Sequence, residues 1–247
     1  MPAPKRSKTY HRLRQFADKP RPLLDYATAN AADAMHRIGV PTRVLDPAIR
    51  PVIPFTKMYG IAITLKLAYS DEYTGYADMY QRAYESAWNV ESPILVIESP
   101  PEARFGTMGS GGAYISRHRY GIQGCILEGG ARDTDDLKRM NYQVYAHFIS
   151  PDHELRKVVG VSAGEPVKVG GVAIRPGDII FGDNDGVVVI APKDIDRVIK
   201  AMEEDAHSET EVIRLIQKGL PFEEITRRFQ PQIAGTRKLV KRRAGNR

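Results

Sequence analysis

Residues Gly124-Cys-Ile-Leu-Glu-Gly-Gly-Ala-Arg-Asp133 combine an apolar run, a glycine pair and two charged residues. Its apolar first half predicts a buried strand over 124–128, and the glycine pair predicts a turn directly after it. Arg132 and Asp133 follow that turn. An aspartate can bind Mg²⁺ or Mn²⁺ with one oxygen, and an arginine can donate to an anionic oxygen of a substrate. The pair is either part of a site or an ion pair in solvent, and these residues alone leave both interpretations open.

A second glycine-rich stretch, Gly106-Thr-Met-Gly-Ser-Gly-Gly112, lies between a predicted strand and a predicted helix. A turn of this kind exposes backbone N–H groups at a helix N-terminus, where a carboxylate or phosphate can bind. It is not a Walker A loop, because no Gly-Lys-Ser/Thr follows it. It is not a dinucleotide fingerprint either, because Tyr114 stands where the third glycine belongs. A tight turn without a ligand is the alternative interpretation.

Helices and strands alternate around these two stretches, and a β-rich part follows from Glu165. This order predicts one α/β domain with a terminal helical arm. In the arm, Ser208 and Glu211 have the spacing of a capping box that would begin a last helix, ended by Gly219. The predicted helices are 23–38, 77–89, a segment through Arg119 and two beyond Pro192; the predicted strands are 60–67, 93–98, 124–128, 143–149 and short segments between 165 and 192.

The composition is that of a globular protein, since 42% of the 247 residues are hydrophobic and 27% are charged. Such a chain is long enough for one large domain or two small ones. Its longest apolar runs are far too short to span a bilayer. Cys125, the single cysteine, cannot form an internal disulfide, and no apolar segment of a signal peptide follows the first basic residues. We therefore expect a cytoplasmic protein.

The net charge of +6 is unevenly distributed along the chain. Residues 1–22 carry +6 and residues 227–247 carry +8, so residues 23–226 carry −8. Basic ends on an acidic body are typical of solvated tails rather than of a nucleic-acid-binding domain. We expect a small molecule as the ligand, and neither nucleic acid nor a membrane as the main partner.

Other side chains are weaker candidates for contact with a ligand. His153 lies in the loop Ser150-Pro-Asp-His-Glu154, which could approach a cleft. No lysine lies within residues 104–136, which argues against Schiff-base chemistry there. An aromatic stripe at helical spacing predicts either core or a subunit interface. Its members are Tyr76, Tyr80, Tyr84 and Trp88.

One spacing connects the two glycine-rich stretches: Gly111, twenty intervening residues, Arg132-Asp133, two more residues and Asp136. It resembles the signature of the 4-hydroxy-4-methyl-2-oxoglutarate aldolase (RraA-like) family. That family also contains the regulator of ribonuclease activity A and many proteins once labelled demethylmenaquinone methyltransferases. The resemblance covers about residues 24–203. Its further motifs are Asp33-Ala34, Gly60-Ile-Ala-Ile-Thr64, Gly121-Ile-Gln-Gly124, Pro166-Val-Lys-Val-Gly-Gly-Val172, Pro176-Gly-Asp178 and Asp183-Asn-Asp-Gly-Val187.

For the architecture, the resemblance implies a swivelling β/β/α-type sandwich with N- and C-terminal helical extensions. The sandwich domain would span residues 23–203, after a basic N-terminal extension over 1–22. A C-terminal helical arm and basic tail would span 204–247. The family also implies a homotrimer or homohexamer, with active sites in the clefts between subunits.

For the chemistry, the resemblance implies a lyase that needs a divalent metal, Mg²⁺ or Mn²⁺. It would cleave a small 4-hydroxy-2-oxo acid, or decarboxylate oxaloacetate, and release pyruvate. Asp133 matches the metal ligand, Arg132 the substrate-binding arginine, and Asp136 a second acidic position that holds a water near the metal. The turn that binds the pyruvyl carboxylate is matched by the backbone N–H groups of Ser110, Gly111, Gly112 and Ala113.

Two alternatives stand beside this lyase. The first is a non-catalytic regulator that binds an RNA-processing enzyme, because such a regulator can keep the Arg-Asp pair. The second is a different enzyme at the same residues, such as another metal-enolate lyase or a hydratase. Pyruvate release from a 2-oxo acid in the presence of Mg²⁺ would separate the proposed lyase from both.

Overall fold

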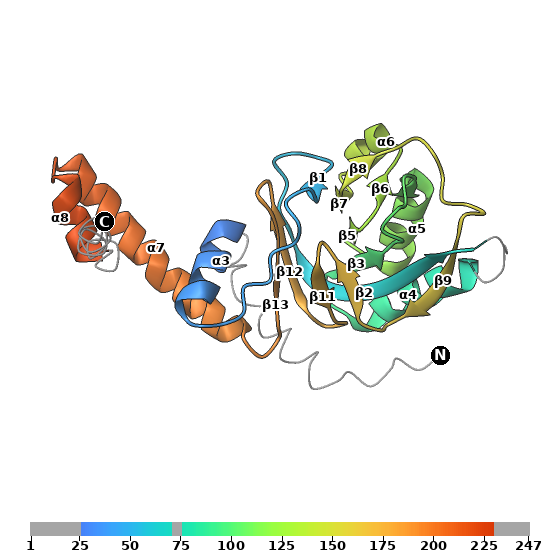
Figure 1. Ribbon diagram of the computed structural model, residues 1–247, viewed down its shortest axis with the longest axis horizontal. Helices are drawn as coiled ribbons and strands as arrows, with labels where there is room; N and C mark the ends of the chain where they lie inside the picture. Colours follow the sequence, from blue (N-terminus) through green and yellow to red (C-terminus); the bar gives the residue numbers. More distant parts are fainter. Residues whose placement is uncertain (1–25, 71–75, 230–247) are drawn as a thin grey trace, which may run out of the picture. The chain divides into compact units, whose positions relative to one another are not determined.

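The computed structural model describes residues 26–70 and 76–229. The expected basic extension over 1–22 and the end of the basic tail, residues 230–247, lie outside these ranges. The described residues form a mixed structure of strands and helices, so the predicted α/β class is confirmed (Figure 1). The chain divides into two compact units after Ile199, and each unit is described by itself.

A mixed sheet of eight strands forms the centre of the first unit. Its order across the sheet is β1 (Arg50–Pro51), β7 (Gln143–Ala146), β5 (Gly124–Leu127), β3 (Pro93–Glu98), β2 (Met58–Tyr69), β12 (Ile179–Asp183) and β13 (Gly186–Ile190), and β9 (Val158–Ala163) pairs with β2. The four strands from β7 to β2 are parallel, and the pairings of β1, β12, β13 and β9 are antiparallel.

The central strands are buried on both faces. In β2, Ile63 and Leu65 belong to one buried cluster and Ala62 to another. A strand covered on both sides reads as a nearly continuous apolar run, which explains the composition of this segment. The first cluster includes side chains of three helices, and the second includes side chains of a β-hairpin. The helices are α4 (Tyr76–Ser86), α5 (Ser110–Tyr120) and α6 (Thr134–Arg139), and the hairpin strands are β10 (Val167–Val169) and β11 (Val172–Ile174).

A second, three-stranded parallel sheet was not predicted. It consists of β4 (Gly106–Met108), β6 (Gly130–Ala131) and β8 (Phe148–Ile149). Two of these strands fall in glycine-rich segments that were interpreted as turns. The predicted strand 143–149 is likewise two strands, β7 and β8, which lie in different sheets. The change of sheet occurs at His147, whose N–H donates to the carbonyl of Gly129 at 3.1 Å.

The helix predicted over 23–38 is α3 (Thr28–Arg37) in the structure. Asp183 of β12 explains this starting point, because its carboxylate binds the first helical residue. Its Oδ2 accepts from the Thr28 N–H at 2.7 Å, and its Oδ1 accepts from the Thr28 hydroxyl at 2.7 Å. A carboxylate at a helix N-terminus satisfies a free N–H donor and interacts favourably with the helix dipole.

The C-terminal helices differ from the prediction. A single helix, α7 (Ile195–Gln217), runs through residue 208, so the separate helix predicted to begin at Ser208 is wrong. The sequence between Met202 and Gln217 holds no glycine or proline to interrupt the helix, and a capping residue acts only where a helix begins. A further helix, α8 (Phe222–Phe229), follows the predicted stop at Gly219, and a 3₁₀ turn, η1 (Ala87–Asn89), follows α4.

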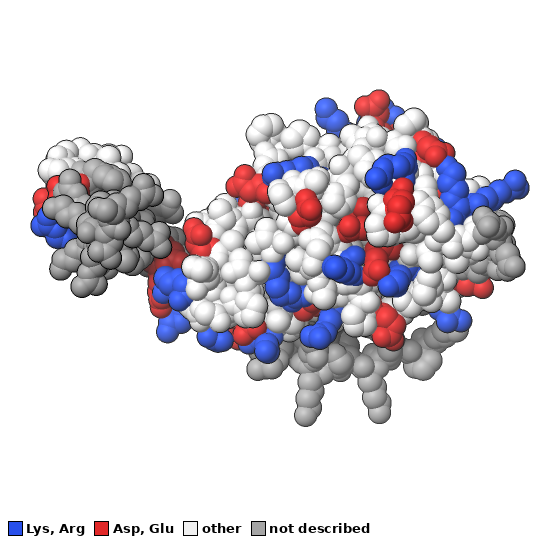
Figure 2. Space-filling model, viewed as in Figure 1, with Lys and Arg blue, Asp and Glu red and all other residues white. Residues whose placement is uncertain are grey.

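The described surface carries both charges. On the face shown in Figure 2, the Lys and Arg side chains of the described residues alternate with Asp and Glu over the sheet unit. Among the described helices, none combines the length and the apolar character needed to cross a bilayer.

Candidate active site

The three-stranded sheet brings the two glycine-rich stretches together. Its strands β4 and β6 are parallel neighbours, with Gly106 opposite Gly130 and Met108 opposite Ala131. Helix α5 begins shortly after β4, and Arg132-Asp133 lies between β6 and α6. Because parallel strands end at the same edge of a sheet, the N-terminus of α5 and the Arg-Asp pair lie side by side. Ligands of α/β proteins commonly bind at such an edge.

Two glycines allow this close approach. A Cβ atom at Gly109 would lie 2.6 Å from Asp133 Oδ2 and 2.9 Å from Arg132 Cγ. A Cβ at Gly106 would lie 2.7 Å from Arg132 Cβ. Non-bonded atoms do not approach a Cβ atom this closely, so a side chain at either position would push Arg132 or Asp133 away. The glycines of the 106–112 stretch therefore serve the site as well as the turn.

Asp133 is held in a defined orientation. It has φ = 53°, in the left-handed region, and directly precedes the first residue of α6. Its Oδ2 accepts from the Ser110 N–H at 3.0 Å and from the Ser110 hydroxyl at 3.1 Å. Its Oδ1 lies 3.3 Å from Arg132 Nε. The Ser110 N–H, helped by the Ser110 hydroxyl and by Arg132, holds the pKa of the Asp133 carboxyl below its usual value. Asp133 is therefore an anion at neutral pH.

The N-terminus of α5 offers backbone donors beside this carboxylate. Its N-cap is Gly109, which has no side chain to cap the helix. The Ser110 N–H donates to Asp133, and the Ala113 N–H donates to the Gly109 carbonyl at 3.0 Å. The resemblance implies that the N–H groups of residues 110–113 bind the substrate carboxylate. Of these four, the N–H groups of Gly111 and Gly112 have no acceptor within the helix. They are the donors that could bind a carboxylate there.

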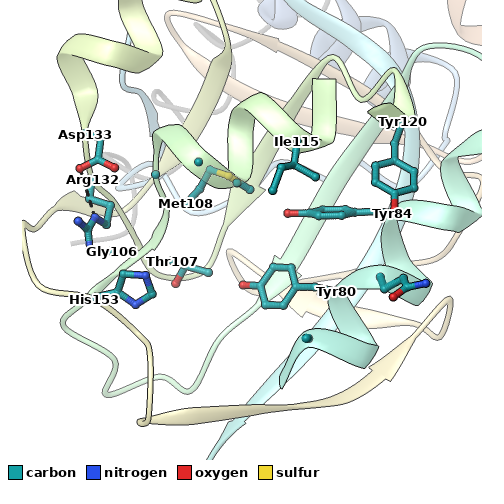
Figure 3. Close-up of a pocket in the computed structure, with 15 residues that line it drawn as sticks. Tyr80, Tyr84, Gly106, Thr107, Met108, Ile115, Tyr120, Arg132, Asp133 and His153 are labelled. Atoms are coloured by element: carbon teal, nitrogen blue, oxygen red, sulfur yellow. Dashed lines mark hydrogen bonds and ion pairs between the residues drawn. The ribbon is translucent and has the colours of Figure 1, made fainter. Parts of the chain in front are cut away.

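A cavity of about 410 Å³ opens at this point. Figure 3 shows Arg132, Asp133 and His153 gathered at one end, and Tyr80, Tyr84, Ile115 and Tyr120 at the other. The first end is charged, and the second is built mainly of aromatic and aliphatic side chains; helix α4 also contributes the polar Gln81 to the lining. Sequence reasoning assigned the tyrosine stripe of α4 to core or interface and did not expect it in a site. Two members of the stripe, Tyr80 and Tyr84, belong to the core and to the site, because their rings are buried and their outer surfaces line the cavity.

His153 lies at the charged end, as its loop position suggested. An isolated bridge pairs its backbone with Gly106. Its Nδ1 accepts from the Leu155 N–H at 2.6 Å, so the neutral ring carries its proton on Nε2. Burial lowers the pKa of His153, and the nearby Arg132 cation lowers it further. His153 is therefore a neutral donor at physiological pH.

Thr107 lies between the two ends of the cavity in Figure 3. Its side-chain oxygen is buried and has no hydrogen-bond partner among the described residues. The same is true of the Ser99 oxygen, but Ser99 does not line the cavity. A buried hydroxyl without a partner is costly, and such exceptions are often found where a ligand binds. No feature of the sequence had singled out Thr107, which stands between glycine and methionine in β4.

Asp136 does not line the cavity. It lies on α6, and its carboxylate forms an ion pair with Arg139 on the same helix. Its side chain is 45% exposed, and it borders two shallower hollows on the surface. The structure thus brings together Arg132, Asp133 and the start of α5, and leaves Asp136 beside them. The role of Asp136 at the metal stays a prediction.

The residues present fit a divalent cation held by few protein ligands. Asp133 is ionised and about one-third exposed at the mouth of the cavity, and its Oδ1 has only one long contact. Mg²⁺ is commonly bound by one or two carboxylates together with water and substrate oxygens. Within residues 26–70 and 76–229, no cluster of three or more His, Cys, Asp or Glu side chains is placed to hold a metal. An all-protein cage is therefore not the kind of site found here.

This geometry is that of an α/β protein with its site at the edge of a parallel sheet, where an Arg-Asp pair meets a helix whose N-cap is glycine. The chain belongs to the RraA-like family, whose model, described as Aldolase/RraA, matches residues 28–189. The predicted family is thereby confirmed.

Relatives and solved structures agree with this assignment. The chain is 31% identical over 166 residues to a Burkholderia mallei protein named "Putative 4-hydroxy-4-methyl-2-oxoglutarate aldolase", covering 66% of this chain and 94% of the relative. It is 27% identical over 188 residues to an uncharacterized protein of Methanocaldococcus jannaschii, covering 72% and 82%.

Two solved structures share the fold at low sequence identity. One is an uncharacterized protein of Pseudomonas syringae, with a TM-score of 0.72, 21% identity and coverage of 85% of this chain and 92% of that chain. The other is RraAS2 of Streptomyces coelicolor, described as an unusual member of the RNase ES inhibitor RraA protein family. Its TM-score is 0.68 at 21% identity, with coverage of 78% and 96%. These likenesses confirm the predicted sandwich fold.

Proposed function

We propose that the protein is a divalent-metal-dependent carbon–carbon lyase that cleaves a small 4-hydroxy-2-oxo acid and releases pyruvate, with oxaloacetate decarboxylation as a companion activity. One observation carries the proposal: Arg132 and ionised Asp133 meet the N-terminus of α5 at the mouth of a cavity large enough for such an acid. Membership of a family described as Aldolase/RraA supports it.

The chain's own residues orient the substrate. The Gly111 and Gly112 N–H groups at the positive end of α5 would bind the C1 carboxylate. The Arg132 guanidinium would donate to the C2 oxygen, where negative charge grows as the C3–C4 bond breaks. Donors that are in place before the reaction need little reorganisation, so they stabilise the transition state more than the bound ketone.

Asp133 would hold the Mg²⁺ or Mn²⁺ ion, with substrate and water oxygens as the remaining ligands. Such an ion, when bound, polarises the 2-oxo group and stabilises the enolate. The Ser110 donors keep the Asp133 carboxylate deprotonated and oriented for this purpose. Asp136 would contribute only if its carboxylate left the pair with Arg139.

We also propose that the protein acts in the cytoplasm as a trimer or hexamer. Trp88, the last member of the aromatic stripe, is 59% exposed, as a side chain that packs against another subunit would be. Light scattering would measure the mass in solution. A stable and fully active monomer would contradict the proposed trimer or hexamer and would leave the proposed lyase activity unaffected.

The direct test is pyruvate release from 4-hydroxy-4-methyl-2-oxoglutarate and from oxaloacetate, followed with lactate dehydrogenase. We expect release that requires Mg²⁺ or Mn²⁺ and that stops on chelation. Release that continues undiminished after chelation would reject the metal-dependent lyase. Stable capture of an RNA-processing enzyme without any turnover of 2-oxo acids would instead support the regulator.

A further inference from the structure

The far end of the cavity has a composition of its own. It is lined by the side chains of Tyr80, Tyr84, Ile115 and Tyr120, and helix α4 also contributes Ala77 and the polar Gln81 to the lining. Among the described residues that line the cavity, Arg132 carries the one fixed positive charge, and it lies at the opposite end beside Asp133 (Figure 3). Among the described residues of one subunit, a group bound at the tyrosines would therefore meet mainly aromatic and aliphatic surface, with the Gln81 amide and no cation.

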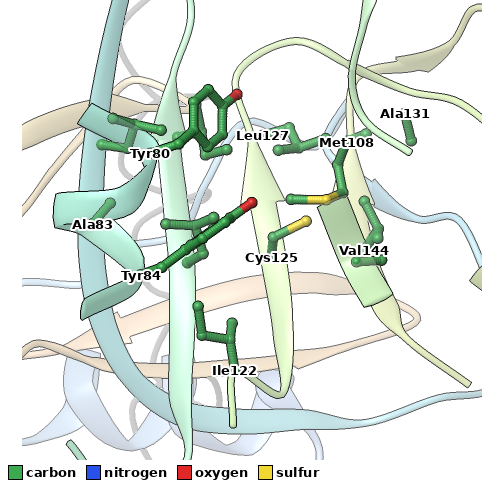
Figure 4. Packing of buried hydrophobic residues seen from close by; sticks show 14 of the residues in the cluster. Tyr80, Ala83, Tyr84, Met108, Ile122, Cys125, Leu127, Ala131 and Val144 are labelled. Atoms are coloured by element: carbon green, nitrogen blue, oxygen red, sulfur yellow. The ribbon is translucent and has the colours of Figure 1, made fainter. Parts of the chain in front are cut away.

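The aromatic end is preformed. The ring of Tyr84 lies 5.9 Å from that of Tyr80 and 5.3 Å from that of Tyr120, distances typical of packed aromatic pairs. Figure 4 shows Tyr80 and Tyr84 packed over the strand that carries Cys125 and Leu127. Rings fixed by a packed core lose little freedom when a ligand binds, so they favour an apolar ligand group.

The electrostatics of this end disfavour an anion. Burial raises the pKa of Tyr84, so its phenol stays neutral. The Tyr80 hydroxyl donates at 2.7 Å to Oε1 of Glu154, which is itself buried. A second carboxylate placed here would lose hydration and would find no cationic side chain among the described residues that line this end.

We infer that the substrate is a 4-hydroxy-2-oxo monocarboxylic acid whose C4 carries an aromatic or branched apolar group, bound among Tyr80, Tyr84 and Ile115. The inference rests on the proposed function, because the charged end then binds the 2-oxo acid. Thr107 lines the cavity between the two ends and would be the nearest hydroxyl to the substrate's 4-hydroxyl. In the reaction this hydroxyl loses its proton, the C3–C4 bond breaks and C4 becomes the carbonyl of an apolar aldehyde. The electron pair stays on C3, which takes up a proton to give the methyl group of pyruvate.

The first experiment compares two aldol substrates. One is 4-hydroxy-2-oxo-4-phenylbutanoate, which yields pyruvate and benzaldehyde; the other is 4-hydroxy-2-oxoglutarate, which yields pyruvate and glyoxylate. We expect kcat/KM to be at least about tenfold higher for the phenyl compound, the difference that one well-formed apolar contact region gives. Preference for the dicarboxylate would overturn the inference and leave the proposed lyase standing.

A pair of variants tests the location. Ile115→Arg places a cation at the apolar end, on a side chain that is 49% exposed and so tolerates the change. We expect the preference to shift toward the dicarboxylate by about tenfold or more. Tyr114→Arg is the matched control, because this neighbour on α5 is 58% exposed and does not line the cavity. An unchanged preference in Ile115→Arg, or an equal shift in both variants, would overturn the assignment.

A binding measurement separates the inference from the proposed function. Titration calorimetry of the Mg²⁺-loaded protein with 2-oxo-4-phenylbutanoate and with 2-oxoglutarate needs no turnover. We expect tighter binding of the phenyl compound by about tenfold, and loss of that difference in Ile115→Arg. If this binding preference is found but no substrate yields pyruvate, the lyase is wrong and the apolar end is still correctly assigned. Equal or reversed affinities would overturn the inference.

Discussion

The Ser110 N–H donates to Asp133 Oδ2 across 3.0 Å, although the two residues are 23 positions apart in the sequence. This bond joins the first residue of α5 to the residue that precedes α6. It places a carboxylate at the positive end of α5, where the helix dipole stabilises negative charge. It also leaves Oδ1 as the less occupied oxygen, beside Arg132.

Asp133→Asn removes the charge and keeps the shape. We expect turnover to fall by at least about a hundredfold, because the variant loses the anion that would hold the metal. Stability should change by about 1 kcal/mol at most, because the side chain is partly exposed and the amide oxygen can still accept from Ser110. Activity assays, Mn²⁺ titration and thermal melts measure these effects.

Asp135→Asn is the matched control for this change. Asp135 is an exposed acid on α6, two residues further on, and it does not line the cavity. The same charge change there should leave turnover and Mn²⁺ affinity at wild-type values. Similar losses in both variants would show that net charge, not the Asp133 carboxylate, causes the effect.

Arg132→Lys keeps the positive charge and loses the planar donor group. If the guanidinium donates to the C2 oxygen, kcat should fall by roughly 10²–10³-fold while KM rises less, because the lost bond is strongest in the transition state. Steady-state kinetics with oxaloacetate measure the separate changes in kcat and KM. A merely structural pair with Asp133 would instead lower stability by at most ~1 kcal/mol and leave kcat unchanged.

Thr107→Val exchanges a buried hydroxyl, which has no partner among the described residues, for a methyl group. Because an unsatisfied buried hydroxyl is costly, we expect a gain of about 1 kcal/mol in the free energy of unfolding. Turnover of 4-hydroxy-2-oxo acids should nevertheless fall by about tenfold, the worth of one hydrogen bond to the substrate. Denaturant unfolding and kinetics on the same protein measure both.

Ser99→Ala provides the comparison. Its hydroxyl is equally buried and without a partner among the described residues, but it does not line the cavity. We expect a similar gain in stability with turnover unchanged. If Thr107→Val retained full activity, the hydroxyl would have no part in substrate binding.

Gly109→Ala tests the close approach at the site. The new Cβ would lie 2.6 Å from Asp133 Oδ2, so the carboxylate must move and the bond to Ser110 must break. We expect a loss of stability of about 1–3 kcal/mol and a large loss of turnover. The double variant Gly109→Ala/Asp133→Ala removes the clash with Oδ2 and leaves the contact with Arg132, so the two losses of stability should be less than additive. Strict additivity would mean that the two residues do not interact.

Local patterns predicted much of the fold and part of the site. The apolar runs at 93–98 and 124–128 are strands, and the glycine-rich turn does precede a helix, because each pattern depends on residues close together in the chain. The spacing from Gly111 to Arg132-Asp133 was also visible, since it is a linear relationship. The separation of the segment 143–149 into two strands was not, because the break depends on a bond between His147 and distant Gly129.

Linear patterns were enough to assign the family and the α/β class and to single out Arg132 and Asp133 as candidate site residues, because periodicity, turn residues and motif spacing are properties of the linear chain. Three contacts could be found only in three dimensions: Ser110 binds Asp133, Asp183 holds the start of α3, and Tyr80 and Tyr84 face the same cavity as Arg132. The physical reason is the parallel pairing of short strands such as β4 and β6. Parallel neighbours are joined by long connections, so residues far apart in the chain meet at one edge of the sheet, and no local pattern records which of them do.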